Sequence, residues 1–288
     1  MENMKVCLPN DSKSVGIGGG WTFRNTLAKY APFEIVETIE EADVCLVCGV
    51  TMITGETFGK MKALGKKIVV RLDGIPEPWR NPRIGIAGRL KGWCDEADGI
   101  VYQSKFTRTL IGKALDLQKG VIILNGADHE VFNDWGETVA LPEGKKILSV
   151  LWRQDPNKRW DEVLMRFREY WQKDKQSSLI MVGDFPNKDF DFGFIFGERF
   201  VYFGGAKPED MAKLMRSCDE FWFPSFADPC PNTLIEALSC GMKVKYVPEY
   251  GGAAEIMKAY KEKGFEYLDA KRMGNDYFNY FKKVLNGN

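Results

Sequence analysis

The chain has 288 residues, in which 40 Lys and Arg balance 40 Asp and Glu, so its formal net charge is zero. At ~150 residues per domain, this length suggests two domains. Hydrophobic residues make up 44% and aromatic residues 13% of the chain, which suffices for two packed cores and excludes a mainly disordered protein. The charge balance argues against a general nucleic-acid coat, although a local basic patch is compatible with it.

The sequence predicts neither a membrane span nor a secretory leader. No apolar run approaches the ~18 residues that a membrane span needs, and the start of the chain has no long apolar stretch and no cleavage-like site. The seven cysteines are odd in number and lie mostly inside apolar runs. This pattern favours free thiols in a reducing compartment, so we expect a cytoplasmic protein with peripheral membrane contact at most.

Short apolar runs rich in β-branched residues alternate with helix-like segments from end to end. We expect strands at residues 5–8, 44–47, 67–72, 99–102, 121–124, 146–151, 178–182, 200–203, 220–223 and 243–247. We expect helices at residues 21–31, 105–117, 160–173, 208–216, 232–240, 253–263 and 275–285. Apolar strands that alternate with helices indicate parallel sheets covered on both faces, which is the α/β fold class.

A polar segment with one proline and two glycines, residues 133–146, separates two α/β series of similar size. We therefore expect two Rossmann-like, doubly wound domains, at residues 1–138 and 139–270, that face a central crevice. Residues 271–288 are expected to form a helix that packs across onto the N-terminal domain, because its aromatic residues lie close to one face. Ligands of such sheets bind at the carboxyl ends of strands, so the residues that follow strands are the candidates for chemistry.

The first candidate is a glycine-rich loop, residues 16–20, which contains Gly18 and Gly19 and precedes the helix expected from residue 21. Glycines let a backbone approach a phosphate, and a helix N-terminus presents N–H groups and the positive end of the helix dipole. The spacing is not that of a G-x-G-x-x-G dinucleotide fingerprint, because the third glycine comes too early. The loop is interpreted as lying near a phosphate or a sugar, and a plain flexible loop is the alternative.

The second candidate is a pair of cations, Arg153 and Lys158, on the loop after the strand at residues 146–151. Two cations held at that edge can bind a diphosphate and stabilise the negative charge that it gains as a leaving group. A solvated basic loop is the alternative interpretation.

The third candidate is a pair of carboxylates, Asp228 and Glu236, eight positions apart. Asp228 lies on the loop after the strand at residues 220–223, and Glu236 lies on the second turn of the following helix. The N–H groups at the start of that helix can hold a phosphate or a sugar while the carboxylates bind hydroxyl groups. The neighbours of Glu236 are apolar, so we expect its carboxylate to need a partner.

Several segments, in order, resemble the retaining GT-B glycosyltransferases with the E-x7-E signature, the glycosyl transferases group 1 or family 4-like enzymes. The segments of the second domain are LSVLWRQDPNKRWDEVL, MVGDF, VYFGGAKPEDMAKLMRSCDEFWFPSF, DPCPNTLIEALSCGMKV and GGAAEI. The segments of the first domain are ADGIVYQSKFTRTLIGKAL and LNGADHEVF. Ordered matches over most of the chain are far more specific than any one of them, and they imply a GT-B fold.

The resemblance implies a role for each matching residue. Arg153 and Lys158 would bind the nucleotide diphosphate. Asp228 would bind hydroxyl groups of the donor sugar in place of the first signature Glu, and Glu236 would bind the ribose. The donor-binding set that we expect is Gly18, Gly19, Gly204, Gly205, Cys230, Pro231, Asn232, Thr233 and Glu236.

The chain departs from the family pattern at two positions. Asp228 is one methylene shorter than the usual Glu, which bears on the choice of sugar. The family often has a His after the first-domain strand at residues 67–72, where this chain has Asp73, so Asp73 joins Arg153, Lys158 and Asp228 as a candidate catalytic residue. The resemblance implies no catalytic metal and no other cofactor, because cations of the protein neutralise the diphosphate.

The resulting prediction is a retaining glycosyltransferase that moves a sugar from a UDP- or GDP-sugar to an acceptor, for which a glycan is the first expectation. A lipid or modified DNA is the alternative acceptor, and the neutral net charge argues against nucleic acid. The alternative outside the enzymes is a catalytically weak module that binds a nucleotide sugar or a sugar. A basic segment at residues 79–93 is interpreted as an acceptor or anionic-surface contact, or as a lid or packing loop.

Overall fold

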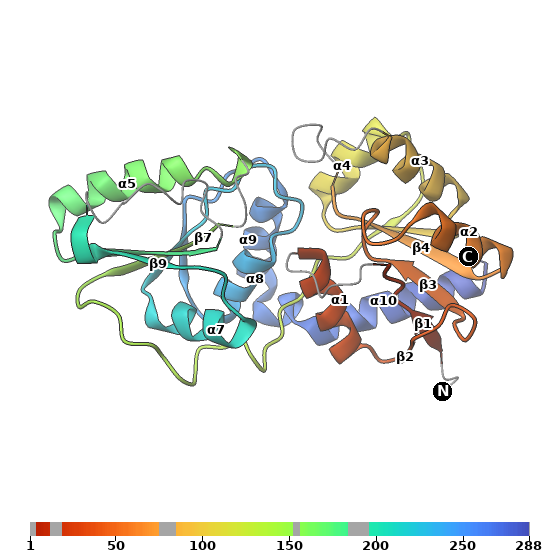
Figure 1. Ribbon diagram of the computed structural model, residues 1–288, viewed down its shortest axis with the longest axis horizontal. Helices are drawn as coiled ribbons and strands as arrows, with labels where there is room; N and C mark the ends of the chain where they lie inside the picture. The colour runs from red at the N-terminus through yellow and green to blue at the C-terminus, as the bar shows by residue number, and fades with distance from the viewer. Residues whose placement is uncertain (1–3, 12–18, 75–84, 152–155, 184–195, 288) are drawn as a thin grey trace. The chain divides into compact units, whose positions relative to one another are not determined.

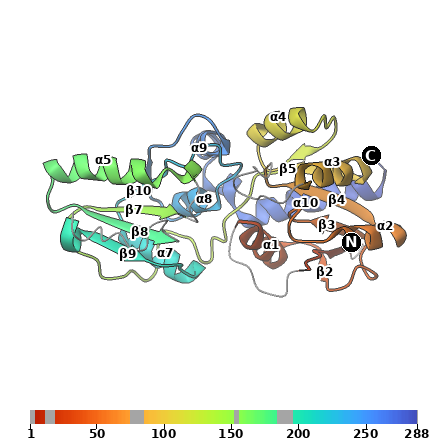
Figure 2. The ribbon, with the colours of Figure 1, turned by 45° about the horizontal axis from the view of Figure 1, so that its top comes forward.

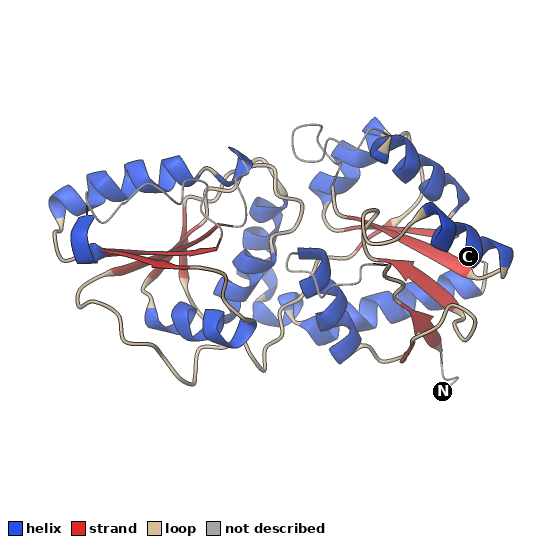
Figure 3. Ribbon diagram, viewed as in Figure 1, coloured by secondary structure: helices blue, strands red, loops and turns tan. Residues whose placement is uncertain are grey.

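The computed structural model describes residues 4–11, 19–74, 85–151, 156–183 and 196–287. The chain divides into two compact units. Unit 1 comprises Met1–Gly126 and Glu266–Asn288, and unit 2 comprises Ala127–Phe265. Each unit is an α/β domain built on its own parallel sheet (Figures 1 and 3).

Unit 1 contains a six-stranded sheet in the order β2-β1-β3-β4-β5-β6, and every pair of neighbouring strands is parallel. Its strands are β1 (Lys5–Cys7), β2 (Glu34–Val36), β3 (Val44–Val47), β4 (Lys67–Leu72), β5 (Gly99–Tyr102) and β6 (Val121–Ile122). The order reverses between β1 and β3. The carboxyl ends of these two strands therefore flank the topological switch point, where open parallel sheets bind their ligands.

Helices cover both faces of the sheet of unit 1 (Figure 2). One face packs against α2 (Gly55–Ala63), α3 (Ile86–Glu96) and α4 (Lys105–Ala114). The other face packs against α1 (Gly19–Tyr30) and α10 (Ala270–Leu285). Strand β4 shows the division, because Ile68 and Val70 belong to the first core and Val69 to the second.

Helix α10 belongs to unit 1 although it comes last in the chain. Its Tyr277 and Phe281 are fully buried, and the Tyr277 ring centroid lies 5.5 Å from that of Phe23 on α1. Gly274 allows the two helices to approach closely, because a Cβ added there would lie 2.6 Å from the Tyr30 carbonyl oxygen. The aromatic face that the sequence shows is thus the face that α10 buries.

Unit 2 contains a five-stranded parallel sheet in the order β11-β10-β7-β8-β9. Its strands are β7 (Lys146–Leu151), β8 (Ser178–Gly183), β9 (Phe200–Phe203), β10 (Glu220–Trp222) and β11 (Lys243–Lys245). Its helical elements are η1 (Pro156–Lys158), α5 (Trp160–Lys173), η2 (Gly197–Arg199), α7 (Pro208–Ser217), α8 (Asn232–Ser239) and α9 (Gly252–Lys263), and η3 (Phe265–Leu268) leads back to unit 1. The order reverses between β7 and β10, so the switch point of this sheet lies at their carboxyl ends.

The strands and helices expected from the sequence are all present, whereas β2, α2, α3 and the short η1, η2 and η3 were not expected. Strand β2 has only three residues, too few to show a periodic pattern. Helices α2 and α3 each contain two glycines, which lower helix propensity and weaken the sequence signal.

The structure divides the chain after Gly126 and after Phe265, whereas the sequence placed the boundaries after residues 138 and 270. The segment after Gly126 is fastened to unit 2 by Arg216 of α7. Arg216 donates hydrogen bonds to the carbonyls of Val131, at 3.2 Å, and Glu137, at 2.9 Å. Val131 and Glu137 thus contact unit 2. The polar residues 133–146 are therefore a surface segment of unit 2 and not a linker between the two units.

The described helices and the cysteines were compared with what the sequence predicts for them. Among the described residues, no helix has the length and apolar character needed to cross a membrane. All seven cysteines are free, and six are buried. Burial raises the pKa of Cys45 and of Cys48 to about 12, so these thiols are inert core residues.

Candidate functional site

At the switch point of unit 2, a lysine and an aspartate from different loops form an ion pair. Lys158 is the last residue of η1, which follows β7, and Asp228 lies on the loop after β10. Lys158 Nζ lies 2.8 Å from Asp228 Oδ2, and the two side chains are 18% and 16% exposed. The structure thus brings together two predicted site residues that are 70 positions apart in the chain.

The backbones of the two loops are also joined. The Phe226 N–H donates a hydrogen bond to the Asn157 carbonyl at 2.7 Å, and the Arg159 guanidinium lies 4.6 Å from the centre of the Phe226 ring. Arg159 follows the lysine and Ala227 precedes the aspartate, and their φ angles are +50° and +55°. Positive φ is uncommon outside glycine and clusters at binding and catalytic sites, which marks these two loops as functional candidates.

Helix α8 begins directly after the loop that carries Asp228. Pro231 precedes its first residue with a φ of −69° and a ψ of 114°. The first-turn N–H groups of a helix have no partners within the helix and carry the positive end of its dipole. Cys230 and Pro231 are buried, and Asn232 and Thr233 are half-buried at the start of the helix. These four predicted donor-binding residues therefore form one continuous segment next to the ion pair.

Glu236 is a buried carboxyl group on the second turn of α8. The residue is 8% exposed, and its neighbours Ile235 and Ala237 are buried as well. Burial raises the pKa of Glu236 to about 7, because no described residue offers a compensating charge or hydrogen bond. A carboxyl group in this setting gains stability from a ligand whose hydroxyl groups donate hydrogen bonds to it.

The predicted glycines of unit 2 lie at the same carboxyl edge of the sheet. Gly204 and Gly205 directly follow β9, and both are exposed. The Gly183 N–H at the end of β8 donates to the Gly204 carbonyl at 3.1 Å, and the Tyr202 hydroxyl donates to the Gly183 carbonyl at 2.7 Å. Only glycine fits at position 183, since its φ is +117° and an added Cβ would lie 1.6 Å from the Leu151 carbonyl oxygen.

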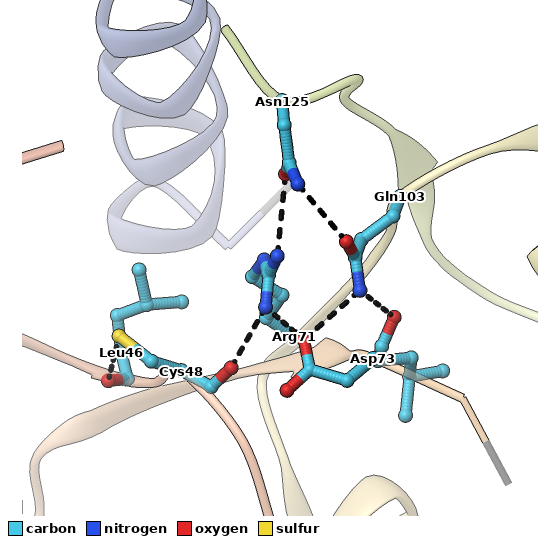
Figure 4. A network of polar contacts seen from close by, with 7 residues as sticks. Leu46, Cys48, Arg71, Asp73, Gln103 and Asn125 are labelled. Carbon is cyan, nitrogen blue, oxygen red and sulfur yellow. Dashed lines mark hydrogen bonds and ion pairs between the residues drawn. The ribbon is translucent and has the colours of Figure 1, made fainter. Parts of the chain in front are cut away.

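Two predicted residues lie in unit 1, at the carboxyl edge of its own sheet. Gly19 is the first residue of α1, and Asp73 directly follows β4 with its side chain 41% exposed. Figure 4 shows that Asp73 contacts Arg71 and Gln103, two residues that the sequence analysis missed. The available signal was an arginine inside the apolar run of β4, where the strand pattern calls for a buried residue.

Two of the predicted residues, Arg153 and Gly18, lie outside the described residues, as does the first part of the basic segment at residues 79–93. The described end of that segment belongs to α3, where Trp93 is buried and its ring stacks on that of Phe58 with centroids 4.8 Å apart. For Trp93, packing is therefore the observed role.

The fold of the whole chain has counterparts among solved structures. HepE (Alr3699) of Anabaena, in complex with UDP and glucose, is 15% identical, with a TM-score of 0.72 over 97% of this chain and 100% of that chain. Sucrose-phosphate synthase (tll1590) from Thermosynechococcus elongatus is 12% identical, with a TM-score of 0.71 over 99% and 100%. A glycosyltransferase from Rickettsia africae ESF-5 is 13% identical, with a TM-score of 0.70 over 99% of each chain. The predicted GT-B fold, with two Rossmann-like domains, is confirmed.

A comparison by sequence finds a family model that matches one part of the chain. Residues 132–268 match the model of the family Glycosyl transferases group 1. The match coincides closely with unit 2, which contains Lys158, Asp228 and Glu236. No curated protein sequence is significantly similar to the chain.

Proposed function

We propose that the protein is a retaining glycosyltransferase that moves a sugar from a UDP- or GDP-sugar to a hydroxyl acceptor, with a glycan as the first candidate. The observation that carries the proposal is the arrangement at the switch point of unit 2. A cation, Lys158, lies beside a carboxylate, Asp228, at the start of α8, and the same helix holds a buried carboxyl group, Glu236, that lacks a described partner. HepE of Anabaena, which shares the fold, has been solved in complex with UDP and glucose and in complex with UDP-glucose.

In this proposal the donor diphosphate binds between Lys158 and the start of α8. The cation and the helix dipole stabilise the negative charge that develops on the diphosphate as the bond to the sugar breaks. Arg153 supplies a second cation in this proposal, because the sequence places it on the same loop as Lys158. Asp228 binds hydroxyl groups of the sugar, and Glu236 accepts hydrogen bonds from the ribose. The departing diphosphate takes the proton of the acceptor hydroxyl on the same face of the sugar, so the configuration at the anomeric carbon is retained.

We also propose that transfer needs no metal ion or other cofactor. The proposal rests on the protein cations at the diphosphate position, which supply the charge stabilisation that a metal would otherwise give. No group of three or more His, Cys, Asp or Glu within the described ranges has the arrangement of a metal site. Activity in excess EDTA should therefore stay within about twofold of the untreated value, whereas full loss that Mg²⁺ or Mn²⁺ restores would refute this part.

The free thiols support a further part of the proposal, a reducing, cytoplasmic setting. A disulfide between any two cysteines of protein purified from its natural source, detected by mass spectrometry without reduction, would contradict it.

A panel of nucleotide sugars tests the function. The protein should release UDP or GDP from at least one donor, faster when a glycan acceptor is present, and NMR of the product should show the donor's anomeric configuration. Lipid and modified-DNA acceptors form separate arms of the assay. If the protein binds a nucleotide diphosphate in calorimetry but releases none from any donor, the binding-module alternative is correct. An inverted anomeric product would refute the retaining mechanism alone.

A further inference from the structure

Unit 1 contains an arginine inside its sheet core that the proposed chemistry of unit 2 does not use. Arg71 lies on β4 with 1% of its surface exposed, and its guanidinium lies 3.7 Å from the centre of the Phe23 ring. Burying a guanidinium is costly, and an apolar residue of similar size is often equally or more stabilising. Stability is therefore a weak reason for an arginine at this position.

Arg71 donates a hydrogen bond to the Cys48 carbonyl at 2.9 Å, and its other polar contacts point to a different role, which is to hold Asp73. Arg71 forms an ion pair with Asp73 Oδ1, and Gln103 Nε2 donates to the same oxygen at 2.9 Å and to the Leu72 carbonyl at 3.0 Å. Asn125 closes the network (Figure 4), since it accepts a hydrogen bond from Arg71 and donates one to Gln103, both at 3.2 Å. Residues from the ends of three neighbouring strands thus fix the orientation of one carboxylate.

The second oxygen of that carboxylate lies at the switch point of the sheet. No described residue donates a hydrogen bond to Asp73 Oδ2, whereas Oδ1 has two donors. A Cβ added at Gly49, after β3, would lie 2.7 Å from Oδ2, and one added at Gly20, in the first turn of α1, would lie 3.7 Å from it. A side chain at either glycine would therefore crowd Oδ2, which lies near the carboxyl ends of β1 and β3, where open parallel sheets bind ligands.

We propose that Arg71 and Gln103 are positioning residues that hold Asp73 so that its Oδ2 accepts a hydrogen bond from a hydroxyl group of a sugar substrate, and that Gly49 keeps this oxygen accessible. The sugar comes from the proposed function, on which this inference rests. A hydroxyl that donates to a carboxylate makes a charge-assisted hydrogen bond, about twice as strong as a neutral one. The hydroxyl belongs either to the sugar that is transferred or to the acceptor, and the chemistry of recognition is the same.

A matched pair of glycine substitutions tests the steric part. Gly49→Ala adds a methyl group 2.7 Å from Oδ2, so either the methyl blocks the oxygen or Asp73 moves. Gly49 does not have a positive φ, so alanine does not strain the backbone there. Gly59→Ala is the control, because Gly59 lies exposed on α2 with no atom within 4 Å of an added Cβ. We expect Gly49→Ala to lower kcat/KM for transfer about 10–100-fold, the range for a lost hydrogen bond to a charged group. Gly59→Ala should match the wild type.

Substitutions in the network test the positioning part. Asp73→Asn preserves shape and should give a kinetic defect like that of Gly49→Ala. Arg71→Met should lower kcat/KM as much as Asp73→Asn does, and Arg71→Lys should lower it less. The double variant Arg71→Met with Asp73→Asn should lower kcat/KM no more than Asp73→Asn alone, because both residues act through the same contact with the sugar. A purely structural arginine would instead lower the melting temperature and would give no rescue by lysine.

Three readouts separate the outcomes. Nucleotide-diphosphate affinity, measured by calorimetry, should stay within about twofold of the wild type in every variant, because unit 2 holds the nucleotide in the proposed function. Donor hydrolysis without acceptor falls if Asp73 binds the transferred sugar, and only transfer falls if it binds the acceptor. If Gly49→Ala does not fold, Asp73→Asn decides. If the wild type is active and the Asp73→Asn and Arg71→Met variants are fully active as well, this inference is wrong and the proposed function stands. If the wild type consumes no nucleotide sugar, both this inference and the proposed function are wrong.

Discussion

Two buried glutamates of unit 2 have opposite electrostatic settings. Glu220 starts β10 at the amino edge of the sheet, where Lys145 Nζ lies 2.7 Å and Lys245 Nζ 3.0 Å from its carboxylate. Glu236 lies on α8, which begins at the carboxyl edge. Burial raises the pKa of both groups, but at Glu220 the contacts with Lys145, Trp222 and Lys245 outweigh it and lower the pKa to about 2. At Glu236 burial acts alone and raises the pKa to about 7.

The difference separates a carboxylate that serves the fold from one that is available to a ligand. The charge of Glu220 is compensated within the protein, so its removal should cost stability. The charge of Glu236 is uncompensated in the described structure, so ionisation of this group opposes folding. Strongly shifted, uncompensated groups at the ligand-binding edge of a sheet are typical of functional sites.

The largest effect is expected at the carboxyl edge. Lys158→Ala should lower the transfer rate ~30–1000-fold, about 2–4 kcal/mol, because it removes a cation that faces the departing diphosphate. Arg153→Ala should lower the transfer rate by the same factor, because the sequence places Arg153 on the same loop as Lys158. Lys213→Ala is a matched control, since Lys213 pairs with Glu137 away from the switch point. Initial-rate kinetics with a saturating acceptor provide the measurement, and near-normal turnover in both variants would remove these cations from the site.

A substitution at the amino edge of the sheet should change the stability of the fold. Glu220→Gln should lower the free energy of unfolding by about 3 kcal/mol. This value is the low end of the range for removing one partner of a buried ion pair, and it applies because both lysines are one-third exposed. The folded pKa of Glu220 lies below its usual value of 4.5, so its stabilisation is full above about pH 4.5 and is lost as the pH falls toward 2. Glu236→Gln should cost no stability at pH 8, because it removes a buried charge. Urea unfolding followed by circular dichroism tests both, and equal losses in the two variants would refute the contrast.

The sequence predicted the parts of the site that lie within short segments. Asp228, the start of α8 and Glu236 fall within nine consecutive positions, so their strand–loop–helix setting can be interpreted locally. The apolar neighbours of Glu236 already indicated a buried carboxylate without a local partner. The ion pair between Lys158 and Asp228 was not predicted, because it depends on the strand order that brings both loops to the switch point.

The network in unit 1 could not be predicted in this way. Arg71, Gln103 and Asn125 come from the ends of different strands, and each is unremarkable in its own segment. Their meeting depends on the register of β4, β5 and β6, which local patterns do not encode. The role of Gly49 is equally hidden, because it depends on the distance to a carboxylate on a neighbouring strand.

Substitutions of Asp228 and Glu236, the two carboxylates at the carboxyl edge, should affect different kinetic constants. Asp228→Asn should lower kcat most, because hydrogen bonds to the reacting sugar strengthen as its ring flattens toward the transition state. Glu236→Gln should raise the donor KM and weaken nucleotide-diphosphate binding, by about 1–3 kcal/mol for a hydrogen bond to a charged group. Steady-state kinetics with varied donor, together with calorimetry on the nucleotide alone, separate the two. If Asp228→Asn weakens nucleotide binding more than Glu236→Gln does, the two roles are reversed.

The smallest effect is a pH dependence of donor binding. Ribose hydroxyl groups donate hydrogen bonds, so they bind best to the ionised Glu236, and the folded pKa of about 7 means that about one-tenth of this group is ionised at pH 6. Donor affinity should therefore rise about tenfold from pH 6 to pH 8 and level off above that. Calorimetry should use an intact nucleotide sugar, because the terminal phosphate of a free nucleotide diphosphate titrates in the same range. Glu236→Gln should bind more weakly and with no such rise, which isolates the contribution of the carboxyl group. A wild-type affinity that stays flat from pH 6 to pH 8, or that rises toward pH 6, would show that the ionised carboxylate of Glu236 does not bind the ribose.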